Sequence, residues 1–371
     1  MSPISGRKPY AELFESLQNE LVRESASGEE SKYKGIVNQV YLNELPAMLP
    51  EAYLKKEAFI LTAADYTTGT VTVGTGTTNI IGSSTSWTAA NSSNFLIDVS
   101  GYNQTYRMTF SAGTSLTFQD SLAWTEASGS GLGYTLFQNR YALPTDFSYM
   151  VKDSPDSPNV VYRYLNNVKI FLTPWTNEEY DRQFTSNIGS IFAYTVRWVA
   201  GSAYLYVASN PDDADNVGYG YIPVLTQLRE LTSGTATLTT GTSLVLTSAA
   251  DMTVSLDTAR TLYFRNDVDG TGSASQWFKI STVTNATVAT LSSSFRGTSG
   301  TGITYTISEI SQWPERFDNI ILYKSAWIVD VDKNQVAKWG TLLSDSISAG
   351  LTTESKRKRG WTLKNFPGMR N

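Results

Sequence analysis

The feature that most restricts the fold of this chain is an internal repeat of a Thr- and Gly-rich pattern. The stretch Thr-Thr-Gly-Thr-Val-Thr-Val at residues 67–73 is followed, 165 residues later, by Thr-Ser-Gly-Thr-Ala-Thr-Leu at 232–238. The stretch Gly-Thr-Thr-Asn-Ile-Ile at 76–81 is echoed at the same offset by Gly-Thr-Ser-Leu-Val-Leu at 241–246. Alternating β-branched residues between turn residues are typical of strands. Two matched stretches at one offset therefore predict two copies of one β-module.

The far ends of the two copies also match. Ser-Gly-Leu-Gly-Tyr-Thr-Leu at 130–136 corresponds to Thr-Gly-Ile-Thr-Tyr-Thr-Ile at 301–307, an offset of 171. Because the offset grows by six, the second copy carries about six extra residues, and we expect the loop at 267–272 to hold them. Turn signals recur roughly every 8–12 residues, as in small sandwiches and barrels. We predict a duplicated antiparallel β-sandwich or barrel at 65–140 and 232–310.

Both ends of the chain are predicted to form helices. Apolar residues recur at three- and four-residue spacing, which places them on one helical face; they are Tyr10, Leu13, Phe14, Leu17, Leu21, then Tyr33, Ile36, Val37, Val40, Tyr41, Leu45 and Met48. Residues 1–64 are therefore predicted to form a helical hairpin. Pro314 stands at a tolerated first-turn position, and residues 311–354 are predicted to form further helices. Short amphipathic helices bury little area alone, so the two ends are expected to pack together as one hub.

The region between the modules, residues 141–231, is predicted to be a mixed α/β connection. Residues 160–164 and 169–172 resemble strands, and 194–198 with 203–208 resembles a strand pair. Thr176 followed by Glu179 is a capping-box pattern that predicts a helix start. The predicted fold class is α+β: a helical hub from the N- and C-terminal helices with two duplicated small antiparallel β-modules.

Two absences narrow the possible chemistry. The chain has no Cys and no His. Catalytic triads with an imidazole base, thiol nucleophiles and Cys/His zinc sites are thereby excluded. Carboxylates remain, and two carboxylic acids suffice for a glycosidase. The sequence predicts no enzyme activity, no cofactor and no metal, with a carboxylate-only glycosidase as a minor alternative.

No secretory signal pattern opens the chain, and no apolar run approaches the roughly 20 residues that span a bilayer. We therefore expect a soluble product. The three Asn-x-Ser/Thr sequons, at Asn91, Asn103 and Asn285, carry little weight without a secretory signal.

Three acidic stretches resemble cation-binding loops. Asp330, Asp332 and Asn334 have the spacing of an EF-hand start, but Gln335 stands where that loop needs Gly and Thr341 where it needs Glu. Residues 210–216 and the pair Asp267 and Asp269 are ordinary turn compositions. We interpret all three as turns or helix junctions.

Two further patterns resemble a glycosidase carboxylate pair and a phosphate-binding loop. Glu178, Glu179 and Asp181 lie near Trp175, but the sequence nominates no second carboxylate across a cleft, so helix capping is preferred to a glycosidase pair. Three glycines at 129, 131 and 133 lie between strands and open no helix, which argues against a phosphate-binding loop.

The strongest electrostatic signal is the C-terminal tail, residues 355–371. It has six basic residues and no acid, so the rest of the chain carries −11 at an overall formal charge of −5. Such segments often act as interaction arms, and interleaved aromatic residues favour docking on protein over a free solvated tail. The predicted docking residues are Lys356, Arg357, Lys358, Arg359, Trp361 and Phe366.

The order of these parts resembles the head-to-tail adaptor proteins of tailed bacteriophages, also described as head-completion or tail tubular proteins. The resemblance rests on the N-terminal helical pair, the strands of 67–73, the stretch Ser83–Asn91, the stretch Ser128–Phe147 and the helix after Trp313–Phe317. It is closest in residues 67–147.

The resemblance implies a structural virion protein, a neck subunit in a ring of typically twelve that joins the portal protein to tail proteins. Double-stranded DNA would pass through its channel without sequence-specific binding, and the basic arm would dock on the portal. The protein would be found in the virion at the head–tail interface, and in the host cytoplasm during assembly. The alternative is a tail fibre or receptor-binding protein whose β-modules bind carbohydrate through exposed aromatic residues such as Trp87 and Trp124.

Overall fold

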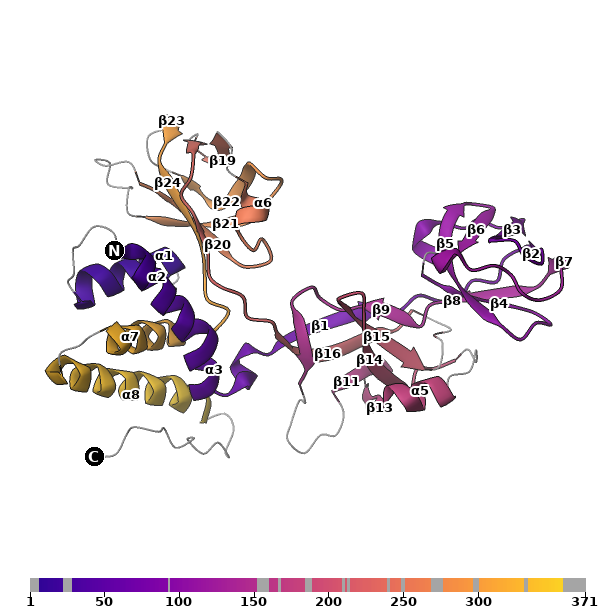
Figure 1. The fold of residues 1–371 in the computed structure, drawn as a ribbon, viewed down its shortest axis with the longest axis horizontal. Helices are drawn as coiled ribbons and strands as arrows, with labels where there is room; N and C mark the ends of the chain where they lie inside the picture. Colours follow the sequence, from indigo (N-terminus) through magenta and orange to yellow (C-terminus); the bar gives the residue numbers. More distant parts are fainter. Residues whose placement is uncertain are drawn as a thin grey trace. The chain divides into compact units, whose positions relative to one another are not determined.

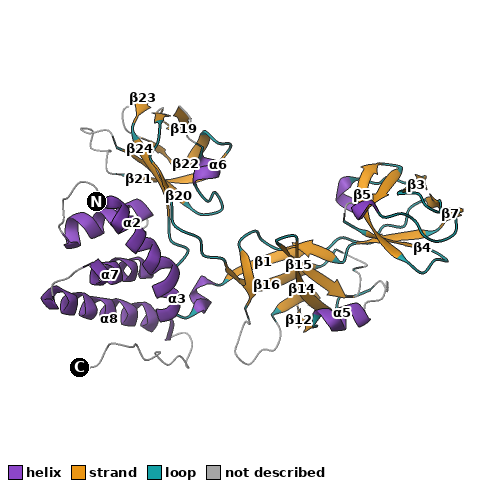
Figure 2. Ribbon diagram, viewed as in Figure 1, coloured by secondary structure: helices purple, strands orange, loops and turns teal. Residues whose placement is uncertain are grey.

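Over the residues that it describes, a computed structural model shows a mixed α+β fold that is mostly β, with four sheets and helices near both ends (Figures 1 and 2). The expected α+β class is confirmed. The structure describes residues 7–22, 29–92, 94–151, 160–165, 168–183, 189–208, 211, 214–238, 241–247, 251–267, 276–295, 300–329 and 333–355. The chain divides into two compact units, Met1–Leu54 with Leu225–Asn371 and Lys55–Val224.

The helices of the first unit come from the two ends of the chain. They are α1 (Tyr10–Ser16), η1 (Leu17–Val22), α2 (Glu30–Gln39), η2 (Val40–Glu44), α3 (Leu45–Met48), η3 (Glu51–Leu54), η5 (Glu315–Phe317), α7 (Asp318–Val329) and α8 (Lys333–Ser355). α7 packs against α1, α2 and α8. The predicted apolar stripes supply this contact, since Leu13, Val37, Tyr41 and Ile320 are fully buried.

The first unit also contains an eight-stranded curled sheet, with one short helix, α6 (Met252–Ser255). Its strands are β17 (Glu230–Leu231), β18 (Thr235–Leu238), β19 (Gly241–Thr247), β20 (Leu262–Asn266), β21 (Trp277–Val283), β22 (Val288–Phe295), β23 (Gly300–Ile303) and β24 (Tyr305–Glu309). We call this sheet β-module 2. Its core is aliphatic with a few phenylalanines, among them Phe264 and Phe295.

A seven-stranded curled sheet in the second unit forms β-module 1, again with one short helix, α4 (Ala89–Ser92), and a 3-10 turn, η4 (Gln119–Ser121). Its strands are β2 (Thr70–Val73), β3 (Asn79–Ser83), β4 (Leu96–Val99), β5 (Thr105–Ala112), β6 (Ser115–Phe118), β7 (Gly129–Leu132) and β8 (Tyr134–Phe137). Its core is more aromatic and holds Trp87 and Trp124.

The two modules have the same strand order. Module 1 runs β7-β2-β3-β6-β5-β4-β8, and module 2 runs β23-β18-β19-β22-β21-β20-β24 with β17 added beyond β24. In module 1 the place of β17 is taken by a bridge between Tyr66 and Leu136, which corresponds to the pairing of Leu231 with Ile307. α4 and α6 also occupy the same place, between the second and third strands of their modules.

Backbone details repeat as well. Gly69 and Gly234, both just before the first strand, have φ values of 89° and 90°, a region that favours glycine. Tyr134 Oη donates to Thr68 O at 2.6 Å, and Tyr305 Oη donates to Ser233 O at 2.8 Å. The repeated sequence stretches therefore occupy equivalent positions in the two curled sheets.

In one stretch the sequence match is displaced by one residue. Val71 pairs with Gly82 in module 1, whereas Ala236 pairs with Leu246 in module 2, so the second strands correspond at an offset of 164. The predicted match of 76–81 with 241–246 is therefore wrong in register. A one-residue shift exchanges the two faces of a strand, and burial of Leu244 and Leu246 determines which face is inward.

The extra residues of module 2 lie where expected. Ile97 pairs with Tyr106, nine positions later, whereas Phe264 pairs with Phe278, fourteen positions later. Most of the length difference therefore falls between β20 and β21, the interval that contains the predicted loop at 267–272.

A third body, in the second unit, is a sandwich of two sheets, which we call the middle sandwich. One sheet holds β1 (Lys56–Leu61), β16 (Asn216–Pro223), β11 (Val161–Leu165) and β12 (Val168–Phe171), with β10 (Phe147–Met150) also on β16. The other holds β13 (Thr173–Pro174), β14 (Ala193–Val199), β15 (Ser202–Ala208) and β9 (Arg140–Ala142). All sheet pairings are antiparallel except β13 with β14. The inner faces meet in one core that includes Val161, Leu205 and Tyr219.

The predicted strands at 160–164, 169–172, 194–198 and 203–208 are confirmed as β11, β12, β14 and β15. The sandwich also recruits β1, which the sequence had placed in the helical segment 1–64. Along β1 exposed and less exposed residues alternate, as in a strand: Phe59 and Leu61 are exposed, and Ile60 between them is less so.

Candidate functional site

The six residues predicted to dock on a portal, Lys356, Arg357, Lys358, Arg359, Trp361 and Phe366, lie outside the described residues. The same holds for Asp330, Asp332 and Asp269.

The acids near Trp175 have structural partners. Thr176 N donates to Glu179 Oε2 at 2.8 Å and Glu179 N donates to Thr176 Oγ1 at 3.1 Å, which is the predicted capping box of α5 (Asn177–Gln183). These hydrogen bonds lower the pKa of Glu179. Asp181 binds Arg197 at 2.6 Å. The cluster thus serves to start a helix and attach it to β14.

The remaining cation candidates have protein partners where they are described. Asp215 binds Arg163 at 3.1 Å, and Asp267 accepts from Arg265 at 2.6 Å and from Thr306 at 2.6 Å. Among the described residues, no group of three or more acids could hold a metal ion. No helix in the described part of the chain is long and apolar enough to cross a membrane. Gly129 and Gly131 lie on β7 and open no helix.

Trp87 and Trp124 are buried in the core of module 1. The indole of Trp87 donates to Tyr134 Oη at 3.0 Å, and that of Trp124 donates to Ala127 O at 3.0 Å. Neither ring can form an exposed platform, so the proposed carbohydrate-binding role of these two residues is wrong. Their aromatic character reflects the volume needed inside a small curled sheet.

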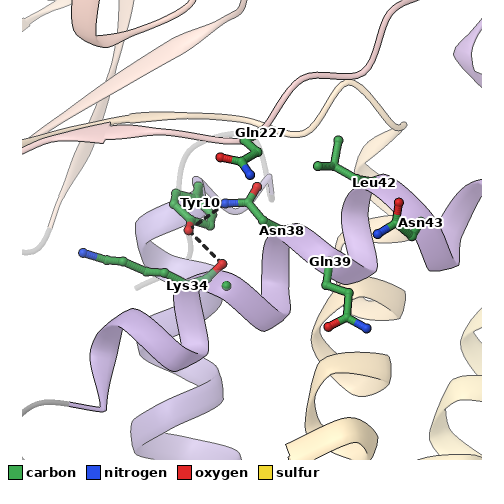
Figure 3. A pocket seen from close by; sticks show the side chains of 8 residues that line it. Tyr10, Lys34, Asn38, Gln39, Leu42, Asn43 and Gln227 are labelled. Atoms are coloured by element: carbon green, nitrogen blue, oxygen red, sulfur yellow. Dashed lines mark hydrogen bonds between the residues drawn. The ribbon is translucent and has the colours of Figure 1, made fainter.

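A depression of about 400 Å³ lies beside α2 (Figure 3). Its lining residues are Tyr10, Lys34, Gly35, Asn38, Gln39, Leu42, Asn43 and Gln227. Asn38 Nδ2 donates to Tyr10 Oη at 2.9 Å and to Leu228 O at 3.1 Å, while Asn38 Oδ1 accepts from Leu228 N at 2.7 Å. Burial raises the pKa of Tyr10 above its usual value. These groups attach α2 to the segment that enters module 2.

Beside it, a buried ion network joins that segment to module 2. Glu309 is fully buried at the end of β24 and binds Arg260 at 2.7 Å and Arg229 at 3.1 Å. Asp257 N also donates to Glu309 Oε1 at 2.7 Å. Burial raises the pKa of Glu309, although these donors act in the opposite direction. Since a buried charge is tolerated only when it is paired, the segment before β17 is held firmly in place.

α1 is attached directly to module 2. Both carboxylate oxygens of Glu15 accept from Arg265 at 2.7 Å, a bidentate pair. Ala11 N donates to the buried Ser308 Oγ at 2.9 Å. The helices and module 2 are therefore joined by charged and backbone contacts as well as by apolar packing.

The N-terminal segment is also held at the start of α7. Lys8 N donates to Asp318 Oδ2 at 3.1 Å, and the Arg7 guanidinium donates to Trp313 O. Asp318 is buried, and burial raises the pKa of its carboxyl to about 7. Residues from both chain ends thus share one polar contact.

The two outer faces of the middle sandwich differ. α5 covers the outer face of the β13-β14-β15-β9 sheet, where Tyr180 is buried with Tyr206. Arg197 lies over both rings, at 5.0 and 5.1 Å. This face is therefore closed by a helix of its own chain.

The outer face of the other sheet, which we call the aromatic face, is exposed. Phe59 is 57% exposed, Tyr164 46% and Phe171 39%. The three rings surround Tyr162, at centroid distances of 6.3, 5.6 and 6.2 Å, and Gly218 lies beneath the Tyr162 ring. An exposed aromatic cluster of this kind usually marks an interaction site.

Sequence reasoning missed the aromatic face because its residues come from β1, β11 and β12, about 100 positions apart. Alternation of Tyr162 with Tyr164, with Gly218 opposite Tyr162, was the available signal. It does not reveal which face is uncovered.

Comparison with known proteins adds no relative: no protein-family model matches the chain, and a search of curated proteins gives no significant match. Function therefore has to follow from the residues and their geometry.

Proposed function

We propose that this protein is a structural adaptor subunit of a tailed-bacteriophage neck, which forms a ring between the portal and the tail and lines the DNA channel. In this proposal the helices of both chain ends form the hub, and the two β-modules are copies of one ancestral module. The ring would contain about twelve subunits, as in the adaptors that the sequence resembles.

The observation that carries the proposal is the joint between the helices and module 2. Helices from both chain ends pack together, and α1 is attached to module 2 by the Glu15–Arg265 pair and by the hydrogen bond from Ala11 N to Ser308 Oγ. A ring under load from packaged DNA needs such firm attachment within each subunit. Two β-modules with one strand order would supply repeated surfaces for neighbouring proteins.

A non-enzymatic role is part of the proposal. Glu179 caps α5, Asp181 binds Arg197, and Glu309 is enclosed by two arginines. Each of these carboxylates has a partner that serves the fold. A glycosidase would instead need two carboxyl groups facing one cleft.

The partners follow from charge and sequence. The six basic residues of 355–371 would dock on the portal through Lys356, Arg357, Lys358, Arg359, Trp361 and Phe366. The rest of the chain is acidic, and like charge would keep DNA from adhering to the channel wall during ejection. Tail proteins would bind the opposite side. The protein would act in the virion neck, after assembly in the host cytoplasm.

The test is electron microscopy and sizing of the purified chain, alone and with purified portal protein. We expect rings, or monomers that form rings on the portal. Deletion of residues 355–371 should abolish portal binding and leave circular dichroism unchanged; replacing only Trp361 and Phe366 by alanine separates apolar docking from charge. A stable elongated trimer that binds cells or glycans would exclude the adaptor.

A further inference from the structure

Two arginines of the second unit meet at a single asparagine. Arg107 lies on β5 of module 1, and Arg140 is the first residue of β9 in the middle sandwich. Arg107 Nη1 donates to Asn94 O at 2.6 Å, and Arg140 Nη2 donates to Asn94 Oδ1 at 2.9 Å. Asn94 is exposed and has a φ of 66°, a region that asparagine tolerates. The two guanidinium groups are therefore held beside one residue at the surface.

The other partners of this arginine pair are neutral as well. Arg107 Nη2 donates to Asn139 Oδ1 at 3.2 Å, and the Arg140 guanidinium lies 4.7 Å from the centre of the Tyr204 ring. Asn139 is buried and donates in turn to Tyr180 Oη at 3.0 Å. Within the described part of the chain, no carboxylate forms an ion pair with either arginine. The pair thus has no counterion among these residues.

Four other arginines that lie within the folded bodies bind carboxylates. The pairs are Arg163–Asp215, Arg197–Asp181, Arg260–Glu309 and Arg265–Glu15. Burial, and after it the charge of Arg140, lower the pKa of Arg107 to about 10, although Asp120 and two tyrosines act in the opposite direction. Arg140 Nε is shielded from solvent and has no hydrogen-bond partner among the described residues. Like charges partly removed from water are unfavourable unless an anion accompanies them.

Module 2 shows that the shared strand order does not need this cation. Leu96 pairs with Arg107 in module 1, and Tyr263 pairs with Lys279 at the same place in module 2. Lys279 is exposed, so water can solvate its charge. The pair of partly buried guanidinium groups is therefore a property of module 1 and its contact with β9.

We propose that Arg107 and Arg140 form a binding site for a doubly charged oxyanion, such as phosphate, which lies beside Asn94 and contacts both guanidinium groups. An arginine has five N–H donors, and its planar fork matches the oxygens of phosphate. A dianion neutralises both charges, whereas one carboxylate or one phosphodiester group of DNA neutralises a single charge. The source is thus the free ion or the terminal phosphate of a larger molecule. The site does not depend on the proposed neck function.

Binding is measured by phosphorus NMR, with inorganic phosphate titrated into the full-length protein at constant ionic strength and about pH 8, above the second pKa of phosphate. We expect saturable binding. Methyl phosphate distinguishes the two sources: if it binds as phosphate does, the site accepts a terminal phosphate, and if it does not bind, the site takes the free ion. Both results support the site. Dimethyl phosphate, which has the single charge of a DNA phosphodiester, should bind at least about tenfold more weakly.

The variant Asn94→Asp supplies the missing carboxylate. Aspartate tolerates the same backbone region, and its second oxygen would replace the anion. This variant should bind phosphate at least about tenfold more weakly and, in chloride buffer, unfold at a temperature at least about 2 °C above that of the unmodified protein. Arg140→Gln should weaken phosphate binding by a similar factor. Arg182→Gln removes an exposed arginine of α5 and is the matched control, which should bind phosphate normally.

Deletion of residues 355–371 removes six further basic residues and should also leave phosphate binding unchanged. Loss of binding in this deletion would assign phosphate to the basic tail and overturn the site. Normal binding by Asn94→Asp or by Arg140→Gln would overturn it as well. So would an unmodified protein that shows no saturable binding, or an Asn94→Asp variant that is less stable than the unmodified protein in chloride.

Discussion

The two β-modules are built on one strand order but filled and attached differently. The first strand, the glycine before it and the tyrosine hydroxyl bound to the preceding turn are the same in both. The side chains of the core are not. Strand order and backbone hydrogen bonds therefore define the module, while packing inside it has changed independently.

The clearest difference between the two cores concerns one pair of positions. Module 1 has Gly82 and Trp87 there, and module 2 has Leu246 and Met252. The correspondence follows from backbone contacts: Trp87 N donates to Gly113 O as Met252 N donates to Ala286 O, and Gly82 N to Thr114 O as Leu246 N to Thr287 O. A large ring beside glycine in one module is replaced by two aliphatic side chains in the other. One large side chain in module 1 thus takes the place of two medium-sized ones in module 2, a kind of exchange that cores tolerate when the total volume changes little.

The difference in attachment is concentrated at the end of the last strand. Glu309, which follows Ile307 by two residues, corresponds to Gln138, which follows Leu136. Glu309 is buried and bound by two arginines, whereas Gln138 is partly exposed and donates to Arg140 O at 2.9 Å. The same position therefore anchors module 2 to its surroundings and serves a local turn in module 1.

The largest expected effect is at this position. Glu309→Ala should destabilise module 2 by about 3–5 kcal/mol, because the buried Arg260 would lose its closest carboxylate and keep only Asp257, at 3.3 Å. Gln138→Ala, the matched change, should cost module 1 no more than about 1.5 kcal/mol.

Hydrogen exchange followed by mass spectrometry measures the two modules separately in the full chain. Peptides of β20 and β24 should lose protection in the first variant, and those of β4 and β8 should change little in the second. Similar losses in both would show that the anchor adds nothing to the shared module.

The sequence predicted the modules because their signals are local. Thr and Val alternation, and a Gly before each first strand, need no knowledge of distant contacts. The capping box of α5 was predictable for the same reason, since Thr176 and Glu179 interact over three residues. Apolar stripes such as Leu13 and Leu17 likewise predicted the buried helix faces.

Local sequence signals do not predict three features: the register of β19, the strand β1 and the aromatic face. In β19, Leu244, Val245 and Leu246 are all apolar, so the pattern does not show which residues point inward. β1 is stabilised by pairing with β16, about 160 positions away. Exposure of Phe59 depends on which sheet face the chain leaves uncovered, which is a property of the whole sandwich.

A smaller effect is expected when the core residues of module 1 are replaced by those found at the same positions in module 2. A Cβ atom at Gly82 would lie closest to the side chain of Thr85 and 2.7 Å from the Trp87 ring, so Gly82→Leu should destabilise module 1 by about 1–3 kcal/mol through overpacking against both. Adding Trp87→Met recreates the pair found in module 2 and should recover part of that loss.

Denaturant unfolding of the two single variants and the double variant measures the coupling, expected at about 0.5–3 kcal/mol in the favourable direction. Leu246→Gly in module 2 is the reverse change and should be destabilising by itself. Additive losses in module 1 would mean that the overpacking at Gly82 falls on Thr85 and not on Trp87.

The smallest effect concerns the hydroxyl that both modules keep. Tyr305→Phe leaves only Ser233 O without its donor and should cost module 2 about 0.5–1.5 kcal/mol. Tyr134→Phe removes two hydrogen bonds, because the same oxygen also accepts from Trp87 Nε1, and should cost module 1 about 1–3 kcal/mol. Exchange protection of β2 and β8, compared with that of β18 and β24, gives the two losses. Equal losses of stability in the two modules would show that the hydrogen bond from the Trp87 indole contributes nothing. The hydroxyl would then stabilise both modules only through its bond to the turn before the first strand.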